Sequence, residues 1–231
     1  MRKILKIFVL SIISIIILVY ISWMVVNEPV PSGKEGEKAE QLANKMLSNL
    51  NYEAYDSVTT LSWSFPGGHH FRWERDSNRV NVKWDQYEVS FYTETKEGTV
   101  TENGNPLSDS KKKEQLIREA WEYFANDSFW MVAPFKVRDP GTSRYYIETE
   151  DGPGLLVTYS SGGVTPGDTY LWVLDENYRP KYWKMWVKII PVGGLKFTWE
   201  GWENRKGVWL STLHKGPLSF ELEMKNISLT Y

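Results

Sequence analysis

The chain of 231 residues contains no cysteine and three histidines, and this scarcity excludes several kinds of chemistry. Without cysteine there is no disulfide scaffold, thiol nucleophile, zinc–thiolate or iron–sulfur site, and no lipid-modified N-terminal cysteine. His69 and His70 are adjacent, so in a strand their side chains point to opposite faces, and His214 lies far away in sequence. We therefore expect no metal site and no cofactor.

Motifs of catalysis and phosphate binding are also missing. No Gly-x-Ser-x-Gly nucleophile elbow occurs, and the stretch Pro66–Gly68 lacks the Lys-Ser/Thr ending of a P-loop. The formal charge of −2 disfavours nucleic acids, because displacing counterions from phosphates requires a basic face. The sequence thus predicts no enzyme, no catalytic residue and no nucleic-acid partner.

One long apolar run stands at the N-terminus. Residues 7–26 are interrupted by three serines and follow the basic residues Arg2, Lys3 and Lys6. At about 1.5 Å per residue, a helix of this length crosses the roughly 30 Å hydrocarbon core of a bilayer. The residues after the run show no small-x-small cleavage pattern, which favours an uncleaved transmembrane anchor over a signal peptide.

The basic flank predicts the orientation and the domain limits. Because Lys and Arg beside a membrane span stay cytoplasmic, residues 1–6 are expected inside the cell and the rest of the chain outside the inner membrane, in the periplasm. Residues 27–33 contain two prolines and are expected to form a short stiff linker. Residues 34–231 then form one extracytoplasmic domain.

Two segments of this domain have the three- and four-residue spacing of apolar residues that is typical of amphipathic helices. They are 34–50 and 108–126, and Ser108 or Asp109 is expected to cap the second. Elsewhere the period is two, and turns rich in Gly, Pro, Asn and Asp separate the strands. The expected strands are 58–65, 70–75, 79–84, 87–95, 99–102, 143–149, 155–159, 169–175, 180–190, 195–204, 208–215 and 218–231. The pattern predicts an α+β domain in which one strongly bent antiparallel sheet carries two long helices on its concave face.

Tryptophan is unusually abundant, with 12 residues. Trp183 and Trp186 have opposite parity on one expected strand, so both faces of that strand carry an indole. Three interpretations stay open: the indoles fill a large core, they line a cavity for an apolar ligand, or exposed indoles stack on sugars. The residues expected to line a hydrophobic cavity are Trp63, Phe65, Trp73, Trp84, Phe91, Trp121, Trp130, Trp172, Trp183 and Trp199.

The order helix, meander, helix, second meander resembles the LolA/LolB-like family of periplasmic lipoprotein carriers, including uncharacterised members from Bacteroidetes-type bacteria. The stretches that carry the resemblance are 129–141 (FWMVAPFKVRDPG), 155–159 (LLVTY), 165–168 (TPGD), 170–175 (YLWVLD) and 199–202 (WEGW). The resemblance covers residues 34–231 and implies a half-open β-barrel that binds acyl chains in its hydrophobic concavity. In that family the carrier is released by signal cleavage and the receptor is held by a lipidated cysteine, whereas this chain has no cysteine and is expected to keep its anchor.

From these observations we expect a membrane-anchored, non-catalytic binding domain for a hydrophobic ligand, either a lipid or an acylated protein. Two alternatives stay open. The domain could be an envelope scaffold whose sheet edges or aromatic patches bind a protein, or a glycan-binding or glycan-active protein. A glycan-active enzyme would need two carboxylates that face each other across a groove.

Overall fold

The computed structural model describes residues 2–162 and 165–231, and Met1, Gly163 and Val164 lie outside the described part. In the first helix, side chains are described from Ser11 onward, except at positions 19 and 22. The helices are α1 (Arg2–Val26), α2 (Glu37–Asn49), α3 (Tyr52–Asp56) and α4 (Ser110–Val132), with the 3-10 turns η1 (Ala133–Lys136) and η2 (Pro217–Ser219). The strands are β1 (Thr60–Phe65), β2 (His69–Glu74), β3 (Arg79–Trp84), β4 (Tyr87–Tyr92), β5 (Gly98–Glu102), β6 (Asn105–Pro106), β7 (Thr142–Thr149), β8 (Gly152–Tyr159), β9 (Thr169–Leu174), β10 (Pro180–Trp186), β11 (Leu195–Thr198), β12 (Glu200–Arg205), β13 (Val208–Lys215), β14 (Glu221–Glu223) and β15 (Lys225–Thr230). The predicted α+β class is confirmed.

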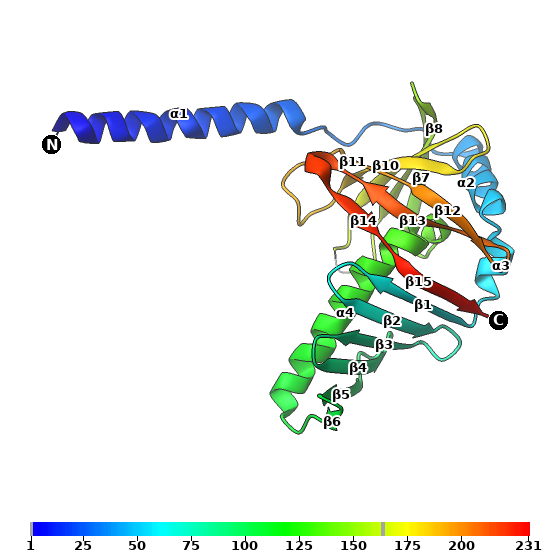
Figure 1. Cartoon of the computed structure of the whole chain (residues 1–231). Coiled ribbons are helices and arrows are strands. Elements are labelled where there is room, and N and C mark those ends of the chain that lie inside the picture. The colour runs from blue at the N-terminus through cyan, green and yellow to red at the C-terminus, as the bar shows by residue number, and fades with distance from the viewer. Residues whose placement is uncertain (1, 163–164) are drawn as a thin grey trace.

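The strands form three antiparallel sheets (Figure 1). The seven-stranded sheet has the order β15-β1-β2-β3-β4-β5-β6, the five-stranded sheet β11-β10-β9-β8-β7, and the three-stranded sheet β12-β13-β14. Two stretches of chain pass from one sheet into the next: β11 leads through Trp199 into β12, and β14 leads through Met224 into β15. At these bends the Trp199 N–H donates to the carbonyl of Lys181, and the Met224 N–H to the carbonyl of Thr212, both at 2.8 Å.

The expectation of a single bent sheet is therefore wrong in its connectivity. The curved surface is interrupted at Trp199 and Met224, where the chain changes its pairing partner. Both bend residues are buried, so the bends keep these large side chains in the common core. Within the described residues the surface is not closed into a barrel, and β6 and β7 are its two end strands.

The second long helix is longer than the sequence suggests. Asp109 caps α4 as expected, since its Oδ1 accepts from the backbone N–H groups of Lys111 and Lys112 at 3.0 and 3.1 Å. The predicted end near Asn126 is wrong, because Asp127 is buried and hydrogen-bonded rather than solvated, and the helix continues to Val132. Trp130, which follows the predicted end of the helix, consequently lies in α4.

One core joins the helices and the sheets. α4 lies across the inner face of the seven-stranded sheet, where the ring of Phe124 is 5.2 Å from that of Trp73 (Figure 1). The buried stripe of α2, which packs on β7 and β8, consists of Ala39, Leu42, Ala43, Met46 and Leu47. Both helices contribute to the same cluster of buried residues, which places them against one continuous apolar interior.

The linker lies along the outer face of the five-stranded sheet instead of standing free. At one end the Trp186 Nε1 donates to the carbonyl of Glu28 at 2.7 Å, and the Glu28 carboxylate pairs with Lys184 of β10. At the other end the backbone of Lys34 exchanges two hydrogen bonds with Tyr146 of β7, at 2.8 and 2.9 Å. The linker thus runs from β10 to β7 across one face of the sheet. This face carries a second, smaller core cluster, which consists of Leu156, Leu171, Val173 and Tyr182.

The N-terminal helix α1 projects away from this body (Figure 1). Its large side chains from Ile12 to Val26 are exposed wherever the structure describes them, and Trp23 donates from Nε1 to the carbonyl of Pro191 at 2.6 Å. The described part of the chain holds no helix whose length and apolar character would let it span a bilayer.

Candidate functional site

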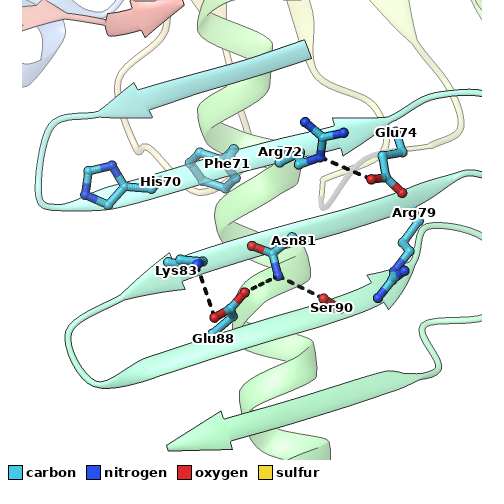
Figure 2. A pocket seen from close by; sticks show the side chains of 9 residues that line it. All are labelled: His70, Phe71, Arg72, Glu74, Arg79, Asn81, Lys83, Glu88 and Ser90. Atoms are coloured by element: carbon cyan, nitrogen blue, oxygen red, sulfur yellow. Dashed lines mark hydrogen bonds and ion pairs between the residues drawn. The ribbon is translucent and has the colours of Figure 1, made fainter. Parts of the chain in front are cut away.

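The described part of the structure contains a polar pocket on the outer face of the seven-stranded sheet and a larger apolar cavity along α4. The polar pocket has a volume of about 410 Å³ and, apart from the buried Phe71 at its base, is built from alternate residues of β2, β3 and β4 (Figure 2). Because successive strand residues point to opposite faces, these side chains lie on the side of the sheet that α4 does not cover. The pocket is lined by His70, Phe71, Arg72, Glu74, Arg79, Asn81, Lys83, Glu88 and Ser90.

The two carboxylates of the polar pocket are paired with cations of the same pocket. Arg72 Nε lies 3.1 Å from Glu74 Oε1, and Lys83 Nζ lies 3.2 Å from Glu88 Oε2 (Figure 2). Glu88 also accepts from the side-chain amide of Asn81 at 3.0 Å. Both carboxylates of the pocket therefore have partners, as is typical of a solvated strand face.

The apolar cavity has a volume of about 860 Å³, near the upper end of the roughly 300–1,000 Å³ range of ligand pockets. It follows α4 from Trp121 to Val132 and continues past strands β8 to β10 to the loop that joins β10 to β11. Its aromatic lining consists of Trp73, Trp121, Tyr123, Phe124, Phe129, Trp130, Tyr159, Tyr170 and Trp183. Its aliphatic and sulfur-containing lining consists of Ala125, Val132, Pro140, Met185, Val187, Ile189 and Ile190.

The continuation of α4 beyond Asp127 brings much of this lining together. Phe129 lies with its ring 5.5 Å from that of Tyr159 and 5.1 Å from that of Tyr170. One residue later, the Trp130 ring lies 5.0 Å from that of Trp183, which in turn lies 4.8 Å from Tyr170. The last turns of α4 and the strands β8 to β10 thus form a continuous wall of rings at the separations that aromatic pairs favour.

Three lining side chains carry buried donors. Trp73 Nε1, Trp183 Nε1 and Tyr159 Oη have no hydrogen-bond partner among the described residues. Burial raises the pKa of Tyr159 well above its usual value, so the hydroxyl stays neutral and remains a donor. Burial also raises the pKa of Tyr170. The wall is therefore uncharged, and it contains donors whose hydrogen bonds are unmade.

Polar groups lie along one margin of the cavity. Lys136 and Asp139 form an ion pair, and the Thr165 hydroxyl donates to the Asp168 carboxylate. Asp168 is buried and also accepts from the backbone N–H of Lys188 at 3.0 Å. The cavity thus combines a long apolar wall with a charged and hydroxylated margin, an arrangement that suits an amphiphilic molecule.

The two adjacent histidines point to opposite faces, as the sequence predicts. His69 Nδ1 lies 2.7 Å from Asp127 Oδ2 on the α4 side, whereas His70 Nδ1 lies 2.9 Å from the Ser64 hydroxyl on the outer side. Burial raises the pKa of Asp127, and its hydrogen bonds from His69 and Asn126 oppose this shift. The pair joins α4 to β2. Within the described residues, no group of three or more His, Asp or Glu side chains is placed to hold a metal ion.

The structure divides the ten residues expected to line a cavity. Four of them line the apolar cavity: Trp73, Trp121, Trp130 and Trp183. Five are buried in the core, namely Trp63, Trp84, Phe91, Trp172 and Trp199, and Phe65 packs against it. The pattern of alternation places an indole on a face, but it does not distinguish a core position from a cavity wall.

Sequence reasoning missed several lining residues. Phe129 lies beyond the predicted end of the helix, and Tyr159 and Tyr170 lie near the ends of expected strands, where no pattern distinguishes them. The expected strand over 180–190 is too long, because β10 ends at Trp186. The Val-Lys-Ile-Ile run at 187–190 belongs to the following loop, where Val187, Ile189 and Ile190 border the cavity.

No family model matches the chain, and the search of curated proteins gives no match. Among solved structures, the chain is similar to a DUF1329 family protein from Desulfovibrio piger, at 10% sequence identity and a TM-score of 0.40. That match covers 84% of this chain and 94% of the other. A likeness at this level carries no functional argument.

Proposed function

We propose that this protein is a non-catalytic, LolA-like binding domain that holds a hydrophobic ligand, a lipid or the acyl chain of an acylated protein, in the cavity along α4. The observation that carries the proposal is the aromatic-lined cavity of about 860 Å³ with an uncharged wall. Such a site has room for a long acyl chain, and its aromatic wall offers no charge that an apolar chain would have to desolvate.

Burial of the acyl chain would be the main source of affinity. About ten methylene groups at about 0.8 kcal/mol each contribute about 8 kcal/mol of favourable transfer free energy, from which the entropic cost of association is subtracted. An acyl chain in the cavity would pack against the rings of Tyr159 and Trp183. The polar margin near Lys136 and Asp168 would then receive the headgroup.

The proposal includes attachment to the inner membrane through residues 7–26, with the domain in the periplasm. In its support, the exposed side chains of α1 include a run of large aliphatic residues, which are Ile12, Ile13, Ile15, Ile16, Ile17 and Leu18. A contiguous apolar surface of this kind is costly in water and is typical of a segment that meets lipid. The basic residues Arg2, Lys3 and Lys6 before it favour a cytoplasmic N-terminus.

A photoactivatable fatty acid tests the ligand. Cells that express the full chain would be fed a diazirine- and alkyne-bearing C16 fatty acid, irradiated, and the purified protein digested for mass spectrometry. We expect adducts on the peptides that line the cavity, around 121–132, 159–170 and 183–190. Adducts confined to α1, or spread evenly over the domain, would contradict binding in the cavity.

A matched pair of variants sharpens this test. Ala125→Trp places an indole in the cavity and should reduce the cavity adducts several-fold, whereas Lys83→Trp adds the same group to the exposed outer face and should leave them unchanged. Thermal unfolding checks that both variants are folded. Equal labelling of the two folded variants would argue against the cavity as the binding site.

A further inference from the structure

The loop between β10 and β11, residues 187–194, contributes both to the wall of the apolar cavity and to the contacts that hold the end of α1. Its residues Val187, Ile189 and Ile190 line the apolar cavity. Its other end holds the exit of α1, because Gly193 N–H donates to Asn27 Oδ1 at 2.8 Å and Gly193 accepts from the Glu28 N–H at 3.0 Å. The wall of the cavity and the end of the N-terminal helix therefore meet in one short loop.

The linker fixes this relationship. Besides the contacts with Gly193, its first residues are held by Trp186 and Lys184, and Lys34, the residue that follows it, pairs with Tyr146 on the far strand of the sheet. Near that end the linker lies so close to β7 that a Cβ added at Gly33 would stand 2.5 Å from the Tyr145 Cβ. A linker attached at both ends cannot act as a loose tether, so α1 has a defined direction relative to the cavity.

The surface of the loop is suited to lipid. Ile189 is 72% exposed even though it belongs to the cavity lining, and Lys188 is the one charged residue in the sequence from 187 to 194. Trp23, the indole at the end of α1, donates to Pro191 in the same loop. Indoles and lysines next to apolar side chains are typical of the interface between membrane and water.

A second turn adds to this surface on the other side of β11. The η2 turn follows β13 and holds Leu218, which is fully exposed and has a left-handed backbone with φ of 55°. Phe220 after it is 43% exposed and packs its ring 5.4 Å from Phe197 of β11. In Figure 1 this turn and the 187–194 loop both project on the side of the body from which α1 leaves. A strained, exposed leucine gains nothing in water, and contact with lipid would give it a partner.

We infer that the 187–194 loop and the η2 turn form a lip that rests on the same bilayer as α1, so that the cavity mouth is held at the membrane surface and the ligand passes between bilayer and cavity across Ile189. This rests on the proposed function in its two parts, the cavity and the membrane attachment. The partner of the lip is then the bilayer itself, and the chain acts as a stationary site for lipid exchange at the membrane.

The absence of cysteine makes a clean experiment possible, since any introduced thiol is unique. Single variants Ile189→Cys and Leu218→Cys, labelled with the environment-sensitive fluorophore NBD, would be reconstituted as full chains in phosphatidylcholine–phosphatidylglycerol vesicles. Tyr231→Cys is the matched control, because this exposed aromatic residue lies at the C-terminus, on the side of the body away from α1 (Figure 1). Doxyl-labelled lipids in the same vesicles report contact with the bilayer by quenching.

We expect at least two-fold quenching at positions 189 and 218 and none at position 231. Combining Ile189→Cys with Asn27→Ala and Trp186→Phe, which remove two linker contacts, should reduce the quenching at 189 while the chain stays with the vesicles. No quenching at 189 or 218, or equal quenching at all three positions, would overturn the lip.

Labelling with the photoactivatable fatty acid distinguishes failure of the lip from failure of ligand binding in the cavity. Retained cavity adducts without quenching at 189 would leave the binding function standing and refute the lip. Loss of the cavity adducts themselves would refute the proposed function, because the lip has no bearing on whether an acyl chain fits beside α4.

Discussion

We expect the free energy of unfolding to fall as the pH drops from about 6.5 to about 4, through the single buried histidine His214. Its ring lies 4.4 Å from that of Trp199 and 5.3 Å from that of Trp130, and its Nδ1 is 3.0 Å from the carbonyl oxygen of Thr198. Removal from water lowers the pKa of His214 from 6.5 to about 4, although the carbonyl of Thr198 and the charge of Glu200 act in the opposite direction. His214 Nε2 has no partner among the described residues. The imidazole is therefore buried in its neutral form.

The sign and size of the effect follow from these two pKa values. In the unfolded chain the imidazole takes up a proton near pH 6.5, whereas in the folded protein it does so near pH 4. Between these values the unfolded state binds one more proton, so acid stabilises the unfolded state. The contribution of His214 is fully present above pH 6.5, and its complete loss by about pH 4 amounts to about 3 kcal/mol.

Urea unfolding of the full chain in nanodiscs, followed by tryptophan fluorescence, would measure this at about pH 7, 6, 5 and 4.5. The comparison is with His214→Gln, which cannot titrate, and with His70→Gln as a control at an exposed histidine. Between pH 7 and 4.5, we expect the free energy of unfolding of the unmodified chain to fall by about 2–3 kcal/mol more than that of His214→Gln. The free energy of unfolding of His70→Gln should fall by as much as that of the unmodified chain. Taking the difference from His214→Gln cancels the contribution of Asp127, whose raised pKa acts in the opposite sense. Parallel pH curves for the unmodified chain and His214→Gln would refute the reasoning.

Three further substitutions test the packing, each by urea unfolding at pH 7. Trp172→Ala removes an indole that lies 5.0 Å from two neighbouring indoles in the core, and should cost about 3–5 kcal/mol; a loss below about 1 kcal/mol would contradict its core role. Gly98→Ala places a Cβ 2.2 Å from the Ser90 carbonyl oxygen, so it should disturb the pairing of β4 with β5 and cost about 1–3 kcal/mol, whereas an unchanged midpoint would argue against that close approach. Asp127→Ala leaves His69 without its buried partner and should cost about 1–3 kcal/mol, while Asp127→Asn should cost less because an amide oxygen remains; equal costs would speak against the hydrogen bond.

Sequence periodicity predicts most of the local structure, because the side-chain repeat of a strand or a helix is a property of the local chain. The two meanders, the start of α4 and its cap at Asp109 follow directly from alternation, spacing and capping chemistry. The opposite orientation of His69 and His70 follows from strand geometry alone. Where a local pattern conflicts with a distant partner, the prediction is wrong. Asp127 looks like a helix end in sequence, but His69 of strand β2 pairs with its carboxylate, and α4 continues past it.

The linker is a second case. Two prolines among residues 27–33 correctly exclude a helix, but they do not show that this segment lies along the five-stranded sheet. That position depends on contacts with Lys184, Trp186 and Tyr146, which are more than a hundred residues away. No local signal identifies such partners.

By itself, the sequence determines the α+β class, the succession of elements, the apolar N-terminal segment and the abundance of indoles on strand faces. Only the tertiary structure decides which of those indoles fill the core and which border a cavity. Trp172 and Trp183 lie on adjacent strands at paired positions, with rings 5.0 Å apart, yet Trp183 borders the cavity and Trp172 is enclosed by the core. The physical reason is that a strand's alternation fixes the face on which a side chain lies, whereas the space in front of that face depends on where α4 crosses it and how far the curved surface bends around it.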